Sequence, residues 1–228
     1  MIGRTLLVTL ALSFLVVPAV VGAAEPAPAK AQIVSLPKPD VTGKVTLEKA
    51  LATRRSVREY APGALTLPEV SQILWAAHGI TGPGGKRTTP SARAVYPLQV
   101  WLVAHDVTGL PPGIYRYVPQ DHALAAVAGD GTRAALLAAC GQPCVEQARA
   151  IVAVVGDSAL AADKFRTNGA RWLSMEAGFV VQNVYLEATA LGLGTVMVGG
   201  FDATAARPAL GAPAGWDVLA LMPIGRRK

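Results

Sequence analysis

GARWLSMEAGFVVQNVYLEATALGLG, residues 169–194, is the stretch that decides the fold. From Gly169 to Leu191 its apolar side chains leave little continuous polar surface, which predicts one long helix. A helix that is apolar almost all round is a buried helix. Gly192 is expected to end it, because glycine readily takes the left-handed conformation that closes many helices. The sequence therefore predicts a buried helix near the C-terminal end of the chain.

Other helices and strands are expected on both sides of this helix. The segment 66–78 combines a capping box, Thr66 with Glu69, an apolar series of helical period and a stop at Gly79. A glycine-rich loop follows at 79–86. Further helices are expected at 46–53, 132–149 with a bend at Gly-Gln-Pro, and 204–210, and strands at 98–104, 115–118, 151–155, 195–198 and 218–222. The alternation lacks the regular period of a doubly wound sheet.

The first 24 residues have the pattern of a secretory signal peptide. Arg4 precedes an apolar run from Leu6 to Val21, and the small residues Gly22 to Ala24 follow. The run is short for a transmembrane span of about 20 residues, although an uncleaved anchor is the alternative. We therefore expect a periplasmic or secreted protein without stable membrane association after cleavage.

One domain is expected after the signal peptide. The chain has 228 residues, of which 52% are hydrophobic and 16% charged, as is typical of one globular domain. Residues 25–44 mix Pro, Ala and Lys without period and predict a flexible leader, so the domain is expected at 45–228. The net charge of +6 comes partly from arginines in a few tight groups, a pattern that disfavours nucleic-acid binding.

Cysteine and histidine residues give no metal-site pattern. Cys140 and Cys144 are the only cysteines, and they fit either a disulfide closed by a bend at Gly141 and Pro143 or two small buried side chains. Two cysteines without a second ligand pair disfavour zinc. His78, His105 and His122 share no spacing that would indicate ligands.

Arginines form three groups far apart in the sequence. Arg54, Arg55 and Arg58 surround Ser56, and guanidinium forks beside a hydroxyl supply the donors that a dianionic phosphate requires. Arg87 with Arg93, and the C-terminal pair Arg226 and Arg227, form the other two groups. Each group alone is as well explained by a solvated surface.

The order of five motifs is more specific than any one of them. The motifs are RRSVREY at 54–60, RTTPSARAVYP at 87–97, EAGFVVQNVYLEATALGLG at 176–194, GGFD at 199–202 and PIGRRK at 223–228. In this order the chain resembles nitroreductase-family flavoproteins over residues 46–228, and most closely the SagB/ThcOx type of dehydrogenase. The resemblance implies a nitroreductase-like α+β fold, a central mixed or antiparallel sheet flanked by helices, and a homodimer with FMN at the subunit interface.

The resemblance also implies cofactor-binding residues. The phosphate and ribityl chain would be held by Arg54, Arg55, Ser56 and Arg58, with Arg226 or Arg227. The loop Pro90, Ser91 and Ala92 would lie along the isoalloxazine ring, and the other side would be formed by Asn183, Leu193, Gly194, Gly199 and Gly200. Glycine suits a backbone that must approach a flat ring.

Some residues near these motifs have more than one explanation. Arg93 stands where the branch pattern leads us to expect glycine, and it fits either a contact to an anionic substrate or an exposed loop. Glu176 is expected to be a structural hydrogen-bond partner. Tyr96, Trp172 and Tyr185 fit either a pocket wall or the core. GLGTVMVGG precedes a strand instead of a helix and lacks the third spaced glycine, which excludes a dinucleotide fingerprint.

These expectations define one enzymatic function and two alternatives. The resemblance implies an FMN-dependent oxidoreductase, linked to NAD(P)H, that transfers hydride through flavin N5 to or from a quinone, nitro-aromatic or heterocyclic substrate. Export leaves the electron donor open, because nicotinamide donors are cytoplasmic. The alternatives are a non-catalytic exported flavin-binding protein and an azoline dehydrogenase acting on peptides. No catalytic side chain is assigned.

Overall fold

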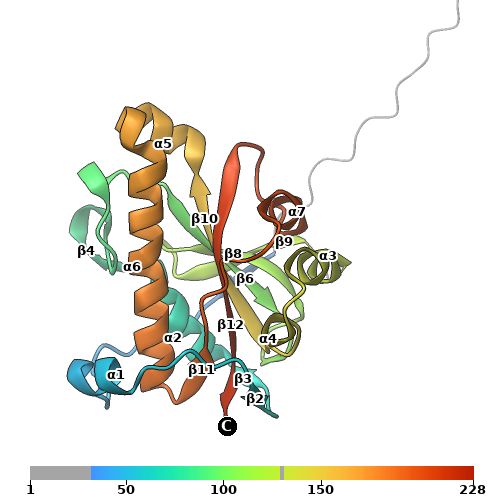
Figure 1. The fold of residues 1–228 in the computed structure, drawn as a ribbon. Helices are drawn as coiled ribbons and strands as arrows, with labels where there is room; N and C mark the ends of the chain where they lie inside the picture. The colour runs from blue at the N-terminus through green and yellow to red at the C-terminus, as the bar shows by residue number, and fades with distance from the viewer. Residues whose placement is uncertain (1–31, 129–130) are drawn as a thin grey trace, which may run out of the picture. The chain divides into compact units, whose positions relative to one another are not determined.

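The computed structural model describes residues 32–128 and 131–228. Within them an antiparallel sheet of eight strands forms the middle layer, and helices pack against both of its faces (Figure 1). The expected α+β class is confirmed, and the sheet is antiparallel rather than mixed. The signal peptide expected at 1–24 lies outside the described residues.

The strand order of the sheet is β1-β9-β8-β6-β10-β12-β11, and β2 pairs with β12 beyond this path. The strands are β1 (Ile33–Ser35), β2 (Tyr60–Ala61), β6 (Leu98–Ala104), β8 (Gly113–Val118), β9 (Ala123–Ala128), β10 (Ala150–Asp157), β11 (Leu193–Thr195) and β12 (Trp216–Arg227). Two small sheets lie outside it: β3 (Leu65–Thr66) pairs with β7 (Val107–Thr108), and β4 (Ile80–Gly82) pairs with β5 (Lys86–Arg87).

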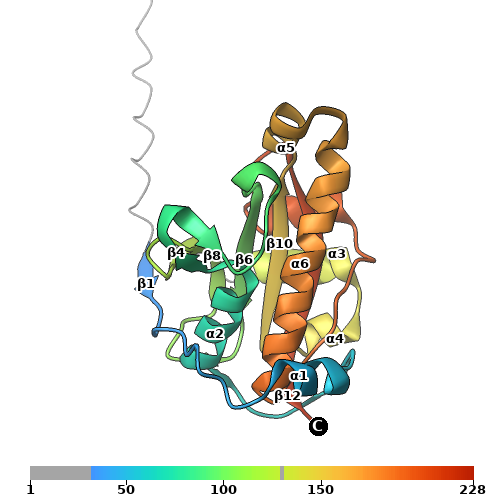
Figure 2. The same ribbon diagram turned by 90° about the vertical axis from the view of Figure 1, so that its left-hand side faces the viewer.

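The two faces of the sheet are covered by different helices. One layer contains α1 (Leu47–Thr53), α2 (Leu67–His78), α5 (Ser158–Phe165) and α6 (Gly169–Ala190), which face the viewer in Figure 2. The other contains α3 (Gly131–Cys140), α4 (Pro143–Glu146) and α7 (Ala203–Ala209). Both views show α1 at the end of the molecule where the C-terminus lies (Figures 1 and 2).

Strand β6 shows why the central strands are apolar at every position. Val100 and Leu102 pack into the core beneath α2, α5 and α6, whereas Trp101 and Val103 pack into a second core beneath α3, α4 and α7. Successive side chains of a strand point to opposite faces, so a strand covered on both faces needs apolar residues throughout. The continuous apolar run that predicted this strand is therefore explained by burial on both sides.

The predicted helix boundaries are confirmed at the capped helices. Thr66 caps α2, its hydroxyl accepts from the Glu69 amide, and the Glu69 carboxylate accepts from the Thr66 amide. Gly79 follows α2, and a Cβ there would lie 2.3 Å from Trp75. The long helix predicted at 169–191 is α6, but it is buried on one face only, because Met175, Gly178 and Phe179 are exposed. Gly192 after it has φ +71°. The predicted strand 98–104 is β6.

The second half of the segment 25–44, expected to be a flexible leader, belongs to the fold. Ile33–Ser35 forms the edge strand β1, paired with β9, and Leu36 is buried. The Asp40 amide donates to the Gln72 side chain at 2.8 Å, and Gln72 Nε2 donates back to the Asp40 carbonyl at 2.9 Å. These long-range contacts carry no sequence period.

Four other elements differ from the prediction. The helix expected at 132–149 is two helices, α3 and α4, separated at Gly141, which has φ +62°. Strand β9 was not predicted, since its alanine-rich sequence has weak strand propensity. The strand expected at 195–198 begins earlier as β11, and the last strand extends through Arg227.

None of the described helices, α6 included, is long and apolar enough to cross a bilayer.

Candidate functional site

Backbone pairing brings the first arginine group to the C-terminal strand. In the pairing of β2 with β12, Tyr60 lies opposite Arg227 and Ala61 opposite Arg226. The Val57 amide donates to the Thr195 carbonyl at 2.9 Å. Residues 54–61 therefore lie beside both β11 and the end of β12, as the shared phosphate site required.

Tyr185 of α6 connects the segments that surround this end of the molecule. Its hydroxyl lies 3.2 Å from Ser56 Oγ and accepts from the Met197 amide at 2.7 Å. The Arg54 guanidinium stands 4.9 Å from the centre of the Tyr185 ring, within cation–π range. Tyr185 is thus buried and positions Arg54, Ser56 and the chain after β11 together.

Four guanidinium groups in this region have no carboxylate partner within 4.0 Å among the described residues: Arg54, Arg55, Arg58 and Arg227. Arg55 donates only to the backbone carbonyls of Ala52 and Arg54, at 3.2 and 2.7 Å. Arg55, Arg58 and Arg227 are exposed. A cluster of unpaired, accessible cations beside a serine hydroxyl suits a phosphate group.

Arg226 is occupied by the protein itself. Its guanidinium makes two hydrogen bonds to the Glu69 carboxylate and two to the Ala64 carbonyl. Burial opposes ionisation of Glu69, but hydrogen bonds from Arg226 and Thr66 outweigh it and lower the pKa of this carboxyl. Of the two C-terminal arginines expected at the phosphate, Arg226 connects β12 to α2 and is already paired. Arg227 is the one that is accessible to a ligand.

Gly194 is a glycine for a reason other than the one expected. A Cβ at this position would lie 2.7 Å from Val57 Cγ1 and 3.1 Å from Val57 Cβ. The space beside Gly194 is therefore filled by the segment 54–60 and not available to a ring. Leu193 is buried, whereas Gly199 and Gly200 are exposed, and a Cβ on either would meet nothing closer than 3.7 Å.

The loop Pro90, Ser91 and Ala92 is held by Glu176. The Glu176 carboxylate accepts from Ser91 Oγ at 3.0 Å and from the Ala92 amide at 2.7 Å, and Ser91 Oγ accepts from the Tyr96 amide. Burial raises the pKa of Glu176, and the two hydrogen bonds oppose that rise. The expectation of a structural hydrogen-bond partner is confirmed for Glu176.

Asn183 fixes the start of the same loop. Its Nδ2 donates to the Ala76 carbonyl of α2 at 3.0 Å and to the Thr88 carbonyl at 3.3 Å. Glu176 and Tyr185 are nine residues apart on α6, a rise of roughly 13 Å along a helix. Helix α6 therefore contacts two separate groups of predicted site residues, one around Tyr185 and one around Glu176.

An apolar groove of about 210 Å³ lies between α6 and Met197. Its lining consists of Ser174, Ala177, Gly178, Val181, Met197, Leu219 and Ala220. A Cβ on Gly178 would meet no atom within 4 Å, so this glycine faces open space. Met175, Phe179 and Met197 are exposed by 51%, 44% and 44%, which is unusual for a group of large apolar side chains.

The sequence did not predict the roles of Tyr185 and Glu69, which position other residues of the site. Tyr185 fitted either a pocket wall or the core, and Glu69 was predicted only as part of a helix cap.

Arg93 donates from Nη1 to the Lys164 carbonyl at 3.0 Å, so its side chain lies on α5 in this structure. The described residues contain no cluster of ligands that could hold a metal ion. Cys140 and Cys144 are free and buried rather than joined.

Comparison with known proteins identifies one family. The model of the family described as "Nitroreductase family" matches residues 51–226. A Methanocaldococcus jannaschii protein named "Putative nitroreductase" is 40% identical over 190 residues, which cover 83% of this chain and 94% of the relative. A crystal structure with the same description from Ralstonia eutropha is 26% identical, with a TM-score of 0.77 over 89% of this chain and 92% of that one.

A further solved structure contains FMN. It is a nitroreductase-like protein from Desulfovibrio desulfuricans, described as a "putative nitroreductase" in complex with FMN. The two chains are 24% identical, with a TM-score of 0.58. The alignment covers 80% of this chain and 87% of that one. At this identity the likeness establishes a shared fold.

Proposed function

The chain belongs to the nitroreductase family, and from that premise we propose that it binds FMN and catalyses two-electron oxidation and reduction of small molecules. The observation that carries the proposal is the convergence of Arg54, Arg55, Ser56 and Arg227 at one end of the sheet. These residues come from both ends of the folded domain, and no structural ion pair satisfies their charges among the described residues.

The phosphate would be held by Arg55, Arg227 and Ser56, with Arg58 near them. Guanidinium groups and a hydroxyl form charge-assisted hydrogen bonds to phosphate oxygens. Arg54 stacks on Tyr185 and would provide positive charge at a fixed position. Arg226 would act indirectly, by anchoring the strand that carries Arg227 to α2.

The flavin ring would lie against the chain from Met197 to Gly200 and the groove beside Gly178. Apolar side chains there exclude water from a ring face, while the exposed backbone at Gly199 and Gly200 permits close approach. The loop Pro90 to Ala92 lies beside Glu176, roughly 13 Å away along α6 from Tyr185. As the family resemblance implies, we propose a homodimer with FMN at the subunit interface.

Exposed apolar residues support that dimer. Met175 and Phe179 lie one turn apart on α6 and are exposed by 51% and 44%. Leu47 and Leu51 lie one turn apart on α1 and are exposed by 58% and 51%. Residues four apart share a helix face. Burying such faces against a second copy removes apolar surface from water at about 25 cal/mol per Å².

When bound, FMN would supply hydride transfer through N5, and the protein would supply binding, orientation and exclusion of water. We propose NAD(P)H as the donor and a quinone, nitro-aromatic or heterocyclic compound as the substrate class. The proposed location is periplasmic or secreted, based on the N-terminal pattern, and there a quinol or another reduced compound would replace NAD(P)H. The five-motif order supports placement in the SagB/ThcOx-type branch.

Two alternatives follow from the same features. In a non-catalytic flavin-binding protein the phosphate site would be retained but the ring face would be covered. The exposed Gly199 and Gly200 and the open groove favour access and hence catalysis. An azoline dehydrogenase acting on peptides would require a partner enzyme that forms the ring, and the proposed export disfavours this alternative.

Purification of the protein and its visible spectrum test the proposal. We expect flavin absorption bands, release of FMN on denaturation, and bleaching under anaerobic conditions by NAD(P)H or a quinol. Failure of FMN to copurify or to reconstitute would overturn the cofactor assignment. Bound FMN that dithionite bleaches, but no donor reduces, would favour the non-catalytic alternative.

A further inference from the structure

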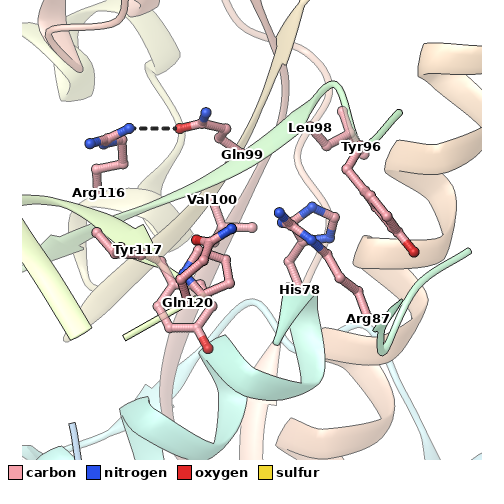
Figure 3. Close-up of a pocket in the computed structure, with 11 residues that line it drawn as sticks. His78, Arg87, Tyr96, Leu98, Gln99, Val100, Arg116, Tyr117 and Gln120 are labelled. Carbon is pink, nitrogen blue, oxygen red and sulfur yellow. Dashed lines mark hydrogen bonds between the residues drawn. The ribbon is translucent and has the colours of Figure 1, made fainter. Parts of the chain in front are cut away.

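A second cavity, of about 100 Å³, lies away from the cation cluster and between β6, the end of β8 and the segment 87–96. Figure 3 shows His78 and Arg87 on one side of it with Tyr96 beyond, and Arg116, Gln99 and Tyr117 on the other. The residues that line it include two arginines and no acidic side chain. Liquid water occupies about 30 Å³ per molecule, so this volume suits a ligand of a few heavy atoms.

Arg87 is an incompletely satisfied cation in the cavity wall. Its guanidinium stands 4.8 Å from the centre of the Tyr96 ring. Its Nε is buried without a hydrogen-bond partner, and no carboxylate lies within 4.0 Å of the side chain, in the part of the chain that the structure describes. Burial lowers the pKa of Arg87, although a guanidinium stays charged in proteins. A half-buried charge without a counter-ion is costly, and an anion would offset that cost.

His78 adds a neutral donor on the same side. It is 2% exposed, and its Nδ1 lies 2.8 Å from Thr89 Oγ1. Burial and the neighbouring Arg87 lower its pKa to about 3, so the ring is neutral near pH 7. The Leu98 backbone acts in the opposite direction and raises the pKa. Nε2 nevertheless has no hydrogen-bond partner of regular geometry among the described residues. If Nδ1 accepts from the threonine, Nε2 carries the proton.

Arg116 completes the opposite wall. Its Nη1 donates to Gln99 Oε1 at 3.3 Å, a long hydrogen bond from an otherwise exposed side chain (Figure 3). The cavity therefore combines two guanidinium groups and side-chain amides with the rings of Tyr96 and Tyr117. Planar guanidinium forks match carboxylate oxygens, and aromatic walls match a short carbon chain.

From this arrangement we infer that the cavity is a binding site for a small monocarboxylate, separate from the proposed flavin site. The carboxylate would accept from Arg87, with Arg116 and the His78 ring as further donors. Because Arg87 directly precedes the chain to Pro90, binding would also fix the start of that loop. The inference does not depend on FMN binding, since none of these donors belongs to the cluster around Tyr185.

Nuclear magnetic resonance of the purified protein tests the inference. Sodium acetate is titrated at constant ionic strength against sodium chloride, and the side-chain amide signals of Gln99 and Gln120, which both line the cavity, are followed. We expect saturable shifts with acetate and none with chloride. Arg87→Gln should weaken acetate binding about tenfold or more, as expected for the loss of a charge-assisted hydrogen bond.

Two further variants separate the site from general effects. Arg116→Gln, on an exposed side chain, should also weaken binding and covers the case in which Arg87→Gln does not fold. Arg171→Gln removes an exposed arginine of α6 outside the cavity and should bind acetate like the wild type. Linear shifts, equal shifts with chloride, or unchanged affinity in both cavity variants would overturn the inference. Saturation by inorganic phosphate but not by acetate would overturn the carboxylate assignment.

Discussion

The hydroxyl oxygens of Ser56 and Tyr185, 129 residues apart in the sequence, lie 3.2 Å from each other. The Tyr185 hydroxyl also accepts from the Met197 amide. One phenol on α6 therefore fixes both the segment that carries the arginines and the segment that is proposed to lie along the flavin ring.

Tyr185→Phe should weaken both folding and cofactor binding. It leaves the Met197 amide without its acceptor, which should lower the free energy of unfolding by about 1–2 kcal/mol. FMN affinity should fall as well, because Ser56 and the chain at Met197 lose their common anchor. Denaturant unfolding and quenching of FMN fluorescence measure the two effects.

Tyr117→Phe is the matched control. The Tyr117 hydroxyl lies 2.8 Å from His122 Nδ1, away from the arginine cluster. Its loss should cost a similar amount of stability but leave FMN affinity within about twofold, since a hydrogen bond elsewhere in the core contributes to folding alone. Equal FMN affinity in the two variants would contradict the positioning role of Tyr185.

Arg227→Gln and Arg226→Gln should have opposite signatures. Arg227 is accessible, and its replacement should weaken FMN binding about tenfold or more through loss of a charge-assisted contact. Arg226 is paired with Glu69, and its replacement should lower stability by about 1–2 kcal/mol, because the half-buried pair is partly screened by solvent. Riboflavin, which has no phosphate, should bind Arg227→Gln and the wild type equally. A riboflavin affinity that falls as much as the FMN affinity would contradict a phosphate contact.

Arg93→Gly should be more stable than Arg93→Ala. Arg93 has φ +55°, a conformation that costs side-chain-bearing residues roughly 1–2 kcal/mol and glycine almost nothing. Both variants lose the hydrogen bond to Lys164, so their difference isolates the backbone effect. We expect an advantage of about 1 kcal/mol for glycine in chemical unfolding. An advantage for alanine would show that this loop does not hold the left-handed conformation in solution.

Stability should fall as the pH is lowered from 7.5 to 5. His78 has a folded pKa of about 3 against an ordinary value of 6.5, so the unfolded chain binds the extra proton first. The stabilising contribution is complete above pH 6.5 and decreases as the pH falls towards 3. By pH 5 the loss from His78 should be about 2 kcal/mol, at 1.36 kcal/mol per pKa unit.

Comparison with His78→Gln isolates this residue. Burial also lowers the pKa of His122, which adds to the loss, whereas burial raises the pKa of Glu176 and Glu187, which opposes it. These groups act in both proteins, so the difference between the two curves of unfolding free energy against pH belongs to His78. Parallel curves from pH 7.5 to 5 would show that His78 is not held neutral.

Much of the architecture was predictable because it is encoded locally. The capping box at Thr66, the apolar run at 98–104 and the long helix before Gly192 each depend on residues close in sequence. Strand β1 depends instead on pairing with β9, and β9 is alanine-rich, so neither has a strong local pattern. Propensity is a weak guide where pairing decides the structure.

The candidate site was predictable by residue type but not by role. The arginines and Ser56 were identified correctly as neighbours of the C-terminal strand, yet the sequence could not distinguish Arg226 from Arg227. That distinction depends on Glu69, whose spacing from Thr66 indicated a cap and whose second partner is 157 residues away. Long-range side-chain pairs of this kind leave no periodic signal in a single sequence.

Gly194→Ala tests the packing that holds the arginine segment in place. The added Cβ would lie 2.7 Å from Val57 Cγ1, closer than real contacts allow, so residues 54–60 or β11 must move. Overpacking of this kind should lower the free energy of unfolding by about 1–3 kcal/mol. Because Ser56 and Arg58 flank Val57, FMN affinity should fall in the same variant. Chemical unfolding and FMN titration give both values.

Val57→Ala in the Gly194→Ala background removes Cγ1 and should restore part of both losses. The double variant should be more stable than the sum of the single effects by about 1 kcal/mol, the size of coupling seen between residues in contact. Gly192→Ala is the control, because Gly192 has φ +71° and no atom within 4 Å of an added Cβ. Its cost comes from backbone conformation and should add to that of Val57→Ala within about 0.5 kcal/mol. Additive effects for Gly194 and Val57 would mean that the arginine segment is not packed against β11, and the convergence of the two chain ends would lose its structural basis.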